Sequence, residues 1–405
     1  MTLLDFKGTQ RVEGITFDDL IAPVGREQFF REYWEQKPLL SKGRDASFFA
    51  PLFTIRDIDR FISLNRPQAG KSIDLVTSEG FIADNYVGMD GVANVRLVTE
   101  SYLNGSTIVL SGLEETWEPL VHFSRALDAE LSHPVAITVY LTPPKFKGVK
   151  PHYDTQENFL LQVEGTKSWR VWSPLQELPP VEGSYVPIPR ERLGEPSFEG
   201  LLEPGDALYI PRGFVHEGIA GDAASLHVTV DIHVRTWVDF VNDAIAAIAQ
   251  REPRFRRSLP VGFLGDENAS AALEPELRDL LGFLRDHAKV SDAVAKHTEL
   301  LAVRKSPPPD GHFASLHAEI GPLTLLIKRR SAVTRVFDEN GVAGIQFSGN
   351  QLIGPAKIAE ALRYVAAHDS VTPASLPGSL SENEKLVLAR RMVRAGLLTV
   401  ADCPR

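Results

Sequence analysis

Hydrophobic and polar residues alternate in short runs between Val135 and Val238. Glycine and proline turns separate the runs, and Glu203 to Asp206 forms one such turn. The runs are VAITVYLTPP, ENFLLQVEGTKSWRVWSP, GDALYIPRGFVHEG and SLHVTVDIHV. Period-two alternation broken by turn residues is typical of an all-β sandwich or barrel. We therefore predict a β core over this segment.

Apolar residues at helical spacing predict helices on both sides of the β core. Before it lie REQFFREYWEQKPLL, whose helix should end before Pro38, and LEETWEPLVHFSRALDAEL, which ends at Leu131. A strand is expected between them, at Ser106 to Gly112. After Arg235 come TWVDFVNDAIAAIAQ and PELRDLLGFLRDHAKVSDAVAKHTELLAV, which predict two or three more helices.

The C-terminal hundred residues mix strands and small helices. A Ser-Pro-Pro-Pro run at 306–309 indicates a linker. Beyond it, GPLTLLIKRR and SAVTRVFDENGVAGIQFSG predict strands, the second with a hairpin at Asn340-Gly341. KIAEALRYVAAH and ENEKLVLARRMVRAGLL predict helices, the latter after a capping box at Ser381 and Glu384. This pattern suggests a compact α+β module, winged-helix-like.

Composition narrows the class of protein. The chain has 405 residues, 43 Lys and Arg against 53 Asp and Glu, and thus a net charge of −10. No apolar run reaches the roughly 20 residues of a membrane span, and charges near the N-terminus argue against a signal peptide. The single cysteine, Cys403, excludes an intrachain disulfide or a cysteine metal cage. We expect a cytoplasmic protein in which nitrogen and oxygen atoms hold any metal.

His152 and Asp154 form the most informative local motif. Residues two apart in a strand point to the same face, so both side chains would aim at one point inside the barrel. A third ligand would complete a two-histidine, one-carboxylate triad with open positions that suit Fe(II). An H-x-D pair also arises by chance, and a structural hydrogen bond is the simpler alternative. The β-rich context favours the metal site.

The third ligand has one leading candidate, His216 in YIPRGFVHEG. An antiparallel neighbouring strand would bring it beside His152. His227 and His233 are the alternatives. His227 shares a strand face with Asp231, which would let it line the same cavity, but a core histidine bonded to a neighbour is the favoured interpretation. His233 lies at the end of that strand.

Lys167 follows the turn formed by Glu164 to Thr166. If its side chain points into the barrel, burial of the ammonium is costly unless an anion pairs with it. A dicarboxylate co-substrate bound to the metal would be such an anion. The alternative is that Lys167 lies in an exposed turn.

Several of these strings together resemble one family. The chain resembles the JmjC-type, cupin-like ribosomal oxygenases in three strings: NFLLQVEGTKSWRVW, which follows HYD, then YIPRGFVHEG, and SLHVTV. The resemblance extends to YLTPPKFKGVKPHYD and YWEQKPLL, and covers most of the chain. It implies an α+β fold with a double-stranded β-helix (jelly-roll) core over 1–235, a helical dimerisation region over 236–303 and a winged-helix-like domain over 304–405. It also implies a dioxygenase dependent on Fe(II) and 2-oxoglutarate.

The resemblance assigns roles to five residues. The iron ligands, and hence the catalytic centre, would be His152, Asp154 and His216. Lys167 matches the basic residue that binds the distal carboxylate of 2-oxoglutarate. Tyr140 matches a position that lines the same pocket.

Two positions of the expected co-substrate pocket depart from the family pattern. Thr138 stands where members often have asparagine, and Asp231 where they have a small hydroxyl residue. With His227, they complete the residues expected at this pocket. A carboxylate beside a dianion would weaken co-substrate binding unless it pairs with a cation or points away.

The function implied is hydroxylation of an arginine or histidine side chain in a ribosomal protein, and an acidic enzyme suits a basic substrate. The alternatives are a tailoring oxygenase for a free amino acid or a biosynthetic peptide, and a non-catalytic metal-binding cupin. Broad apolar faces in the helical middle suggest a homodimer. The basic stretches 251–257 and 328–330 raise nucleic-acid binding, but a solvated surface is favoured. Neither a nucleic acid nor a membrane is expected as a partner.

Overall fold

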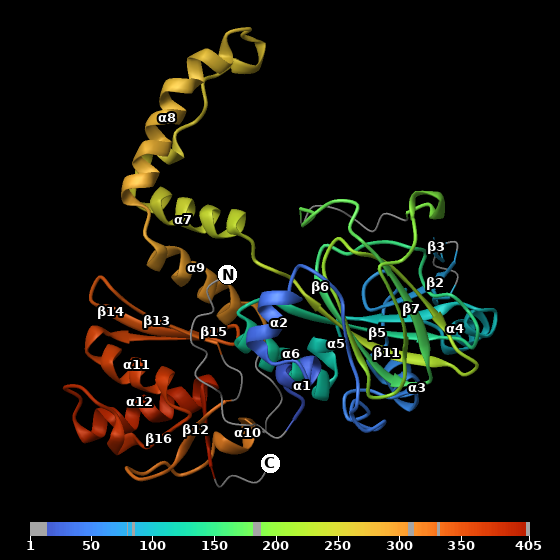
Figure 1. Ribbon diagram of the computed structural model, residues 1–405. Coiled ribbons are helices and arrows are strands. Elements are labelled where there is room, and N and C mark those ends of the chain that lie inside the picture. Colours follow the sequence, from blue (N-terminus) through green and yellow to red (C-terminus); the bar gives the residue numbers. More distant parts are fainter. Residues whose placement is uncertain are drawn as a thin grey trace. The chain divides into compact units, whose positions relative to one another are not determined.

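The computed structural model describes residues 14–78, 80–82, 86–180, 188–306, 312–329 and 333–401 (Figure 1). The chain divides into two compact units, 1–234 and 235–405. The prolines of the expected linker, 307–309, lie outside the described residues. Among the described residues, no helix combines the length and the apolar character that a membrane span requires.

The first unit holds six helices and eleven strands among its described residues. The helices are α1 (Phe17–Ile21), α2 (Arg26–Glu32), α3 (Ile55–Asn65), α4 (Val95–Leu103), α5 (Leu113–Thr116) and α6 (Glu118–Leu131), with a 3-10 turn at Arg190–Arg192. The strands are β1 (Leu39–Ser41), β2 (Ile73–Thr77), β3 (Gly80–Phe81), β4 (Thr107–Ser111), β5 (Val135–Thr142), β6 (Glu157–Glu164), β7 (Lys167–Trp172), β8 (Phe198–Leu202), β9 (Ala207–Ile210), β10 (Val215–Ala220) and β11 (Ser225–Ile232).

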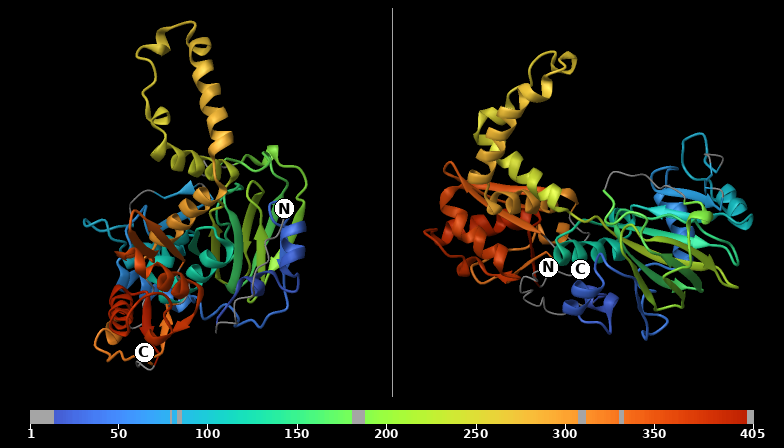
Figure 2. Two further views of the ribbon diagram at one scale, coloured as in Figure 1. Left: turned by 90° about the vertical axis from the view of Figure 1, so that its left-hand side faces the viewer. Right: turned by 45° about the horizontal axis from the view of Figure 1, so that its top comes forward.

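The strands form two antiparallel sheets that make up the walls of the barrel. The large sheet has the order β1-β9-β6-β11-β5-β4-β2-β3 and the small sheet the order β10-β7-β8. Figures 1 and 2 show the strands around β5, β6, β7 and β11 as one barrel-like body. Isolated bridges at Lys147 and His152 add one more segment to the edge of the small sheet, beside β10. The predicted β core and its jelly-roll architecture are confirmed.

Alternation along the central strands separates the main core from the barrel interior. On β11, Leu226, Val228 and Val230 belong to a buried cluster with Phe17 of α1 and Phe123 of α6, so this face packs against the helices. The other face of the same strand points into the barrel. One part of that interior is filled by an apolar cluster that includes Leu160, Trp169, Val171, Leu202, Leu208, Ile210 and Phe214. The remaining part is polar.

The first predicted helix is shorter than its sequence pattern indicated. α2 ends at Glu32 instead of continuing towards Pro38, and Glu35 takes a positive φ of 58°. The Trp34 ring stacks on Tyr209 at 6.1 Å, and the Glu35 N–H donates to the Tyr209 hydroxyl at 2.9 Å. Tertiary contacts with β9 therefore override the helical periodicity. The strand at 106–112 and the helix ending at Leu131 are confirmed as β4 and α6.

The second unit begins with three long helices and continues with small sheets and helices. The helices are α7 (Trp237–Arg251), α8 (Ala269–His287), α9 (Val290–Arg304), α10 (His312–Ser315), α11 (Ala359–Ala367) and α12 (Glu382–Ala395). The strands are β12 (Leu326–Lys328), β13 (Thr334–Glu339), β14 (Val342–Phe347), β15 (Asn350–Pro355), β16 (Ser370–Val371) and β17 (Leu398–Val400). They form two sheets, β13-β14-β15 and β16-β12-β17.

Local signals in the second unit agree with the structure. The hairpin between β13 and β14 turns at Asn340 and Gly341, which have φ of 53° and 78°, as a primed turn requires. Ser381 and Glu384 form the predicted capping box of α12. The strand expected over GPLTLLIKRR is limited to β12. α8 contains no buried residue along its whole length, and it extends away from α7 and α9 in Figure 2.

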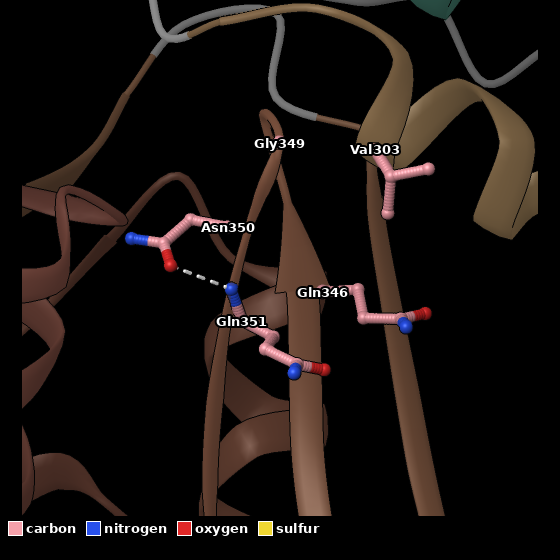
Figure 3. A pocket seen from close by; sticks show the side chains of 5 residues that line it. All are labelled: Val303, Gln346, Gly349, Asn350 and Gln351. Carbon is pink, nitrogen blue, oxygen red and sulfur yellow. Dashed lines mark hydrogen bonds between the residues drawn. The ribbon is translucent and has the colours of Figure 1, made fainter.

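A hollow of about 380 Å³ lies in the second unit, beside the β14–β15 turn (Figure 3). It is lined by Val303, Gln346, Gly349, Asn350 and Gln351. The Gln351 N–H donates to the Asn350 side-chain oxygen at 2.8 Å, which fixes the turn. None of the residues predicted from the sequence to form a site lies here.

Candidate metal centre

An antiparallel bridge places His152 beside His216. The N–H of His216 donates to the carbonyl of His152 at 2.8 Å, and the reciprocal bond is 3.3 Å long. His216 lies on β10, whereas His152 lies in the segment before β6. The two imidazole ring centres are 4.5 Å apart. Backbone pairing therefore brings together two histidines that are 64 positions apart in the sequence.

The ring nitrogens of both histidines are oriented for metal binding. Nδ1 of His152 lies 2.8 Å from the carbonyl of Lys150, and Nδ1 of His216 lies 3.1 Å from that of Phe214. Carbonyl acceptors require Nδ1 to carry the proton, which leaves the Nε2 lone pair for a ligand. Burial, and then the nearby His152, lower the pKa of His216 to about 4, so this imidazole is neutral.

Asp154 completes the donor set. Its two carboxylate oxygens lie 3.6 Å from Nε2 of His152 and 3.4 Å from Nε2 of His216. The Asn158 amide donates to Asp154 at 2.5 Å and orients the carboxylate. One donor atom from each of the three residues lies within 4.8 Å of the others. Two imidazoles and one carboxylate fit a divalent cation such as Fe(II), and three protein ligands leave coordination positions for others.

Lys167 is buried, with 2% of its surface exposed, so it does not lie in an exposed turn. Its ammonium donates to the Thr142 hydroxyl at 3.2 Å and lies 5.0 Å from the centre of the Trp169 ring. No carboxylate among the described residues is ion-paired with it, and burial lowers its pKa to about 7. A buried ammonium without a counter-ion is costly, which points to an anionic ligand.

Two glycines make room around this ammonium. A Cβ at Gly148 would lie 3.5 Å from Nζ of Lys167, and a Cβ at Gly218 would lie 2.7 Å from its Cε. Gly218 pairs with Trp169 across β10 and β7. A side chain at position 218 would therefore push against both the lysine stem and the indole ring. The absence of side chains at Gly148 and Gly218 therefore leaves space around the ammonium of Lys167.

Tyr140 and His227 form one wall of the same cavity. Their rings stack at 4.9 Å with an angle of 5°, and the Trp169 ring meets His227 edge-on at 5.5 Å. Burial, and then the neighbouring Lys167, hold the pKa of His227 well below its usual range. Among the described residues, Nδ1 of His227, Oγ1 of Thr229 and Nε1 of Trp169 are buried without a hydrogen-bond partner. Buried polar atoms of this kind require a partner, such as an ordered water or a polar ligand.

Thr138 and Asp231 are bonded to each other. The Thr138 hydroxyl donates to the Asp231 carboxylate at 2.9 Å. Burial, and then the charge of Asp154, raise the pKa of Asp231 to about 8. His233 lies beyond the end of β11, where its N–H donates to the carbonyl of Pro134 at 2.8 Å. The structure thus gathers eight of the expected residues at the barrel interior and leaves His233 outside.

Sequence reasoning missed four residues of this cavity: Thr142, Asn158, Trp169 and Thr229. Trp169 lies two positions after Lys167 on β7, so strand periodicity alone puts both side chains on one face. The same rule connects Thr142 to Tyr140 on β5, and Thr229 to His227 on β11. Asn158 carried no signal of its own, because its role depends on the loop that returns Asp154 to the start of β6.

Comparison with known proteins agrees with this geometry. Residues 116–240 match the family model of the JmjC domain. Ribosomal oxygenase 1 of Gallus gallus is 32% identical over 293 residues, which cover 68% of this chain and 48% of the relative. Ribosomal oxygenase 2 of Rattus norvegicus is 32% identical over 297 residues, 71% of this chain and 62% of the relative. The chain thus spans about half to three fifths of the length of these curated relatives.

Among solved structures, YcfD, a ribosomal oxygenase from Escherichia coli in complex with cobalt and 2-oxoglutarate, shares the fold. The TM-score is 0.55 at 17% identity, and the match covers 94% of this chain and 99% of YcfD. The resemblance drawn from the sequence motifs is confirmed. The chain is therefore a JmjC-domain protein related to the ribosomal oxygenases.

Proposed function

We propose that this protein is an Fe(II)- and 2-oxoglutarate-dependent dioxygenase that hydroxylates an arginine or histidine side chain in a ribosomal protein. One observation carries the proposal: a donor set of two imidazoles and a carboxylate lies in the same barrel as a buried lysine that pairs with no carboxylate of the described residues. The names of the relatives, and the cobalt and 2-oxoglutarate held by YcfD, support the substrate class and the cofactors.

Different residues of the barrel would bind the iron, position its ligands and bind the co-substrate. His152, Asp154 and His216 would hold the iron, and Asn158 positions Asp154. Bound iron and 2-oxoglutarate supply the oxidising chemistry, as cofactors generally do, while the protein orients the reactants. Lys167 pairs with the distal carboxylate of 2-oxoglutarate.

The apolar cluster around Leu160 and Trp169 fills the adjoining part of the barrel and excludes water there. Tyr140, Trp169 and His227 form aromatic walls against the co-substrate. Their unpartnered ring nitrogens, Nε1 of Trp169 and Nδ1 of His227, can bond its oxygen atoms directly or through water.

The substrate class predicts a mass change. We expect incubation of the protein with Fe(II), 2-oxoglutarate and total ribosomal protein to add one oxygen to a single ribosomal protein, measured by intact-mass spectrometry. The His216→Ala variant is the control, because it removes one iron ligand and leaves the outer surface unchanged.

The alternatives predict other results of this incubation. Succinate formation without any oxygenated ribosomal protein would favour a tailoring oxygenase for a free amino acid or a biosynthetic peptide. A protein that binds divalent metal but forms no succinate under any condition would favour the non-catalytic cupin.

We also propose the division into a catalytic domain over 1–235, a helical dimerisation region over 236–303 and a winged-helix-like domain over 304–405. α8 supports a dimer, because none of its 19 residues is buried, whereas most of the stability of a helix in a protein comes from packing of one face. It exposes Leu277 and Leu281, four residues apart on one face. A second copy of the chain would cover this face.

The dimer predicts a mass close to twice 44.7 kDa in size-exclusion chromatography with light scattering. We expect the double variant Leu277→Asp and Leu281→Asp to elute as a monomer, since a buried carboxylate at the interface is costly. Leu64→Asp, at an even more exposed leucine of α3, should leave the dimer intact. A wild-type mass near that of one chain would exclude the dimer.

Two arginines of the basic stretch 251–257 are paired with carboxylates, which argues against nucleic-acid binding there. Arg251 pairs with Asp292 at 2.5 Å, and Arg254 pairs with Asp279 at 2.5 Å and with Glu252 at 3.1 Å. Guanidinium groups already paired with carboxylates have less charge to offer to phosphates. A ribosomal substrate also fits the cytoplasmic location expected from the sequence.

A further inference from the structure

The turn between β9 and β10, residues 211–214, contacts two of the three candidate metal ligands. The Gly213 N–H donates to the carbonyl of Asp154 at 2.8 Å. The carbonyl of Phe214 lies 3.1 Å from Nδ1 of His216, which orients the ring and leaves Nε2 for the metal. Asp154 lies outside the strands, so its position depends on contacts of this kind. Contacts that hold this turn in place therefore also hold Asp154 and His216.

Arg212 anchors this turn through its side chain. The guanidinium is buried, and it donates to the Glu35 carboxylate from Nη2 at 2.8 Å and from Nε at 3.2 Å. It also donates from Nη1 to the carbonyl of Pro179 at 3.4 Å, and its Nε lies 3.5 Å from the Glu157 carboxylate. A buried guanidinium is costly unless anions and acceptors surround it, so these contacts hold Arg212 in one position.

Glu157 joins the same cluster from the start of β6. Its side chain is fully buried and accepts hydrogen bonds from the Tyr209 hydroxyl and, at 3.4 Å, from the Arg212 backbone N–H. Burial raises the pKa of Glu157 to about 7, so this carboxyl group is only partly ionised at neutral pH. Arg212 and Glu35 therefore supply the ion pair of the cluster, whereas Glu157 contributes hydrogen bonds.

Glu35 belongs to YWEQKPLL, a string near the N-terminus that lies outside the metal centre and the co-substrate pocket. Its backbone has a positive φ of 58°, which a residue other than glycine adopts only where surrounding contacts hold it. Glu35 has two such contacts, because its N–H donates to the Tyr209 hydroxyl at 2.9 Å and its carboxylate pairs with Arg212. Backbone strain of this kind is frequent near functional sites, which suggests a role for the string beyond packing.

We infer that Arg212 and Glu35 are positioning residues of the metal centre. Their ion pair fixes the turn at 211–214, and this turn places Asp154 and His216 for metal binding. The inference rests on the metal centre of the proposed function and gives the N-terminal string a part in it. Both residues act through the backbone of the turn and not as ligands.

The experiment measures binding of Co²⁺, as a substitute for Fe(II), to the metal-free protein by titration calorimetry and by the visible absorption of the bound ion. We expect Arg212→Gln to weaken Co²⁺ binding by roughly 10- to 100-fold, the usual effect of losing a contact that orients metal ligands. The absorption bands should also change, because they depend on the coordination geometry. A purely structural role would lower the melting temperature of the metal-free protein, while the folded protein would keep its affinity and spectrum.

Arg44→Gln is the matched control. Arg44 also joins the N-terminal segment to a turn of the barrel, since it donates to the carbonyls of Asp19 at 2.7 Å and of Gly205 at 3.2 Å. The turn at Gly205 carries none of the three ligands, so this variant should keep the wild-type Co²⁺ affinity and spectrum. If Arg212→Gln fails to fold, Glu35→Gln tests the same ion pair at a side chain that is 30% exposed. It should weaken Co²⁺ binding in the same direction by a smaller factor.

Arg212→Gln and Glu35→Gln proteins with the wild-type Co²⁺ affinity and spectrum would overturn the inference and leave the metal centre intact. Arg44→Gln with as large a loss of affinity as Arg212→Gln would overturn it as well, because the loss would then reflect stability in general. A wild-type protein that binds no Co²⁺ would instead overturn the metal centre of the proposed function, and the inference with it.

Discussion

Replacement of Asp154 by alanine is expected to reduce succinate formation to the rate without enzyme. The carboxylate is the one oxygen donor of the triad and the contact through which Asn158 fixes the site. Its loss leaves two imidazoles. They bind a divalent ion weakly, because the negative charge of the carboxylate no longer stabilises the bound cation. Succinate release by the purified variant, and metal content after dialysis against Fe(II) under anaerobic conditions, measure the two consequences.

Asp222→Ala is the matched control for Asp154→Ala, because Asp222 is exposed and bonded only to the exposed Lys145 within the described chain. We expect wild-type activity and metal content from it. If Asp154→Ala retains both activity and bound iron, Asp154 is not a ligand and the assignment of the triad is wrong. If it retains iron but loses activity, the carboxylate acts on the co-substrate instead.

Lys167→Met is expected to raise the 2-oxoglutarate concentration needed for half-maximal rate by roughly 10- to 100-fold, as for a lost hydrogen bond to a charged group. Methionine keeps the apolar stem against Trp169 but removes the ammonium. Lys145→Met removes a lysine from the exposed turn and serves as control. Gly218→Ala should act in the same direction as Lys167→Met, because its Cβ displaces the lysine stem. An unchanged requirement in Lys167→Met would assign the co-substrate carboxylate to another partner.

The same lysine predicts a pH dependence. Burial lowers its pKa to about 7 in the free protein, and a bound dianion would raise it again. Because the charged form binds, the affinity for 2-oxoglutarate should be constant below pH 7. Above pH 7 it should fall by about tenfold for each pH unit, with uptake of one proton on binding. Titration calorimetry in buffers of different ionisation enthalpy measures this proton uptake, which should vanish in Lys167→Met.

The β core could be predicted because it depends on short-range patterns, whereas the candidate metal triad also needed a guess about which strands are neighbours. Alternation identifies β5, β6, β7 and β11. The strand expected at His152 and Asp154 is wrong, because His152 forms only an isolated bridge and Asp154 lies in the loop before β6. His216 was chosen from three histidines because of its place in an antiparallel neighbour. The structure supports that reasoning through the bridge to His152.

Other features depended on contacts that sequence patterns do not carry. The end of α2 is set by Tyr209 on β9, far along the chain. The direction of Lys167 depends on the tight turn at Gly165, with φ of 65°, and on the pairing of Lys167 with Ala220. The hydrogen bond from Thr138 to Asp231 was not expected, since the sequence suggested only that Asp231 pairs with a cation or points away. To predict any of these three features, one must know which strands are neighbours in the fold.

The bridge between His152 and His216 has a consequence for the integrity of the barrel. The segment from Lys145 to His152 is attached to β10 by a few backbone hydrogen bonds, among them those of Lys145 to Gly221 and of His216 to His152. An ion bound by both His152 and His216 would cross-link this segment to β10. Its binding free energy would add to the free energy needed to separate the two locally. Amide exchange in this segment should therefore slow on metal addition, while the helical face of the large sheet keeps its rates. Bound iron would therefore stabilise the pairing of this segment with β10, in addition to its part in the reaction.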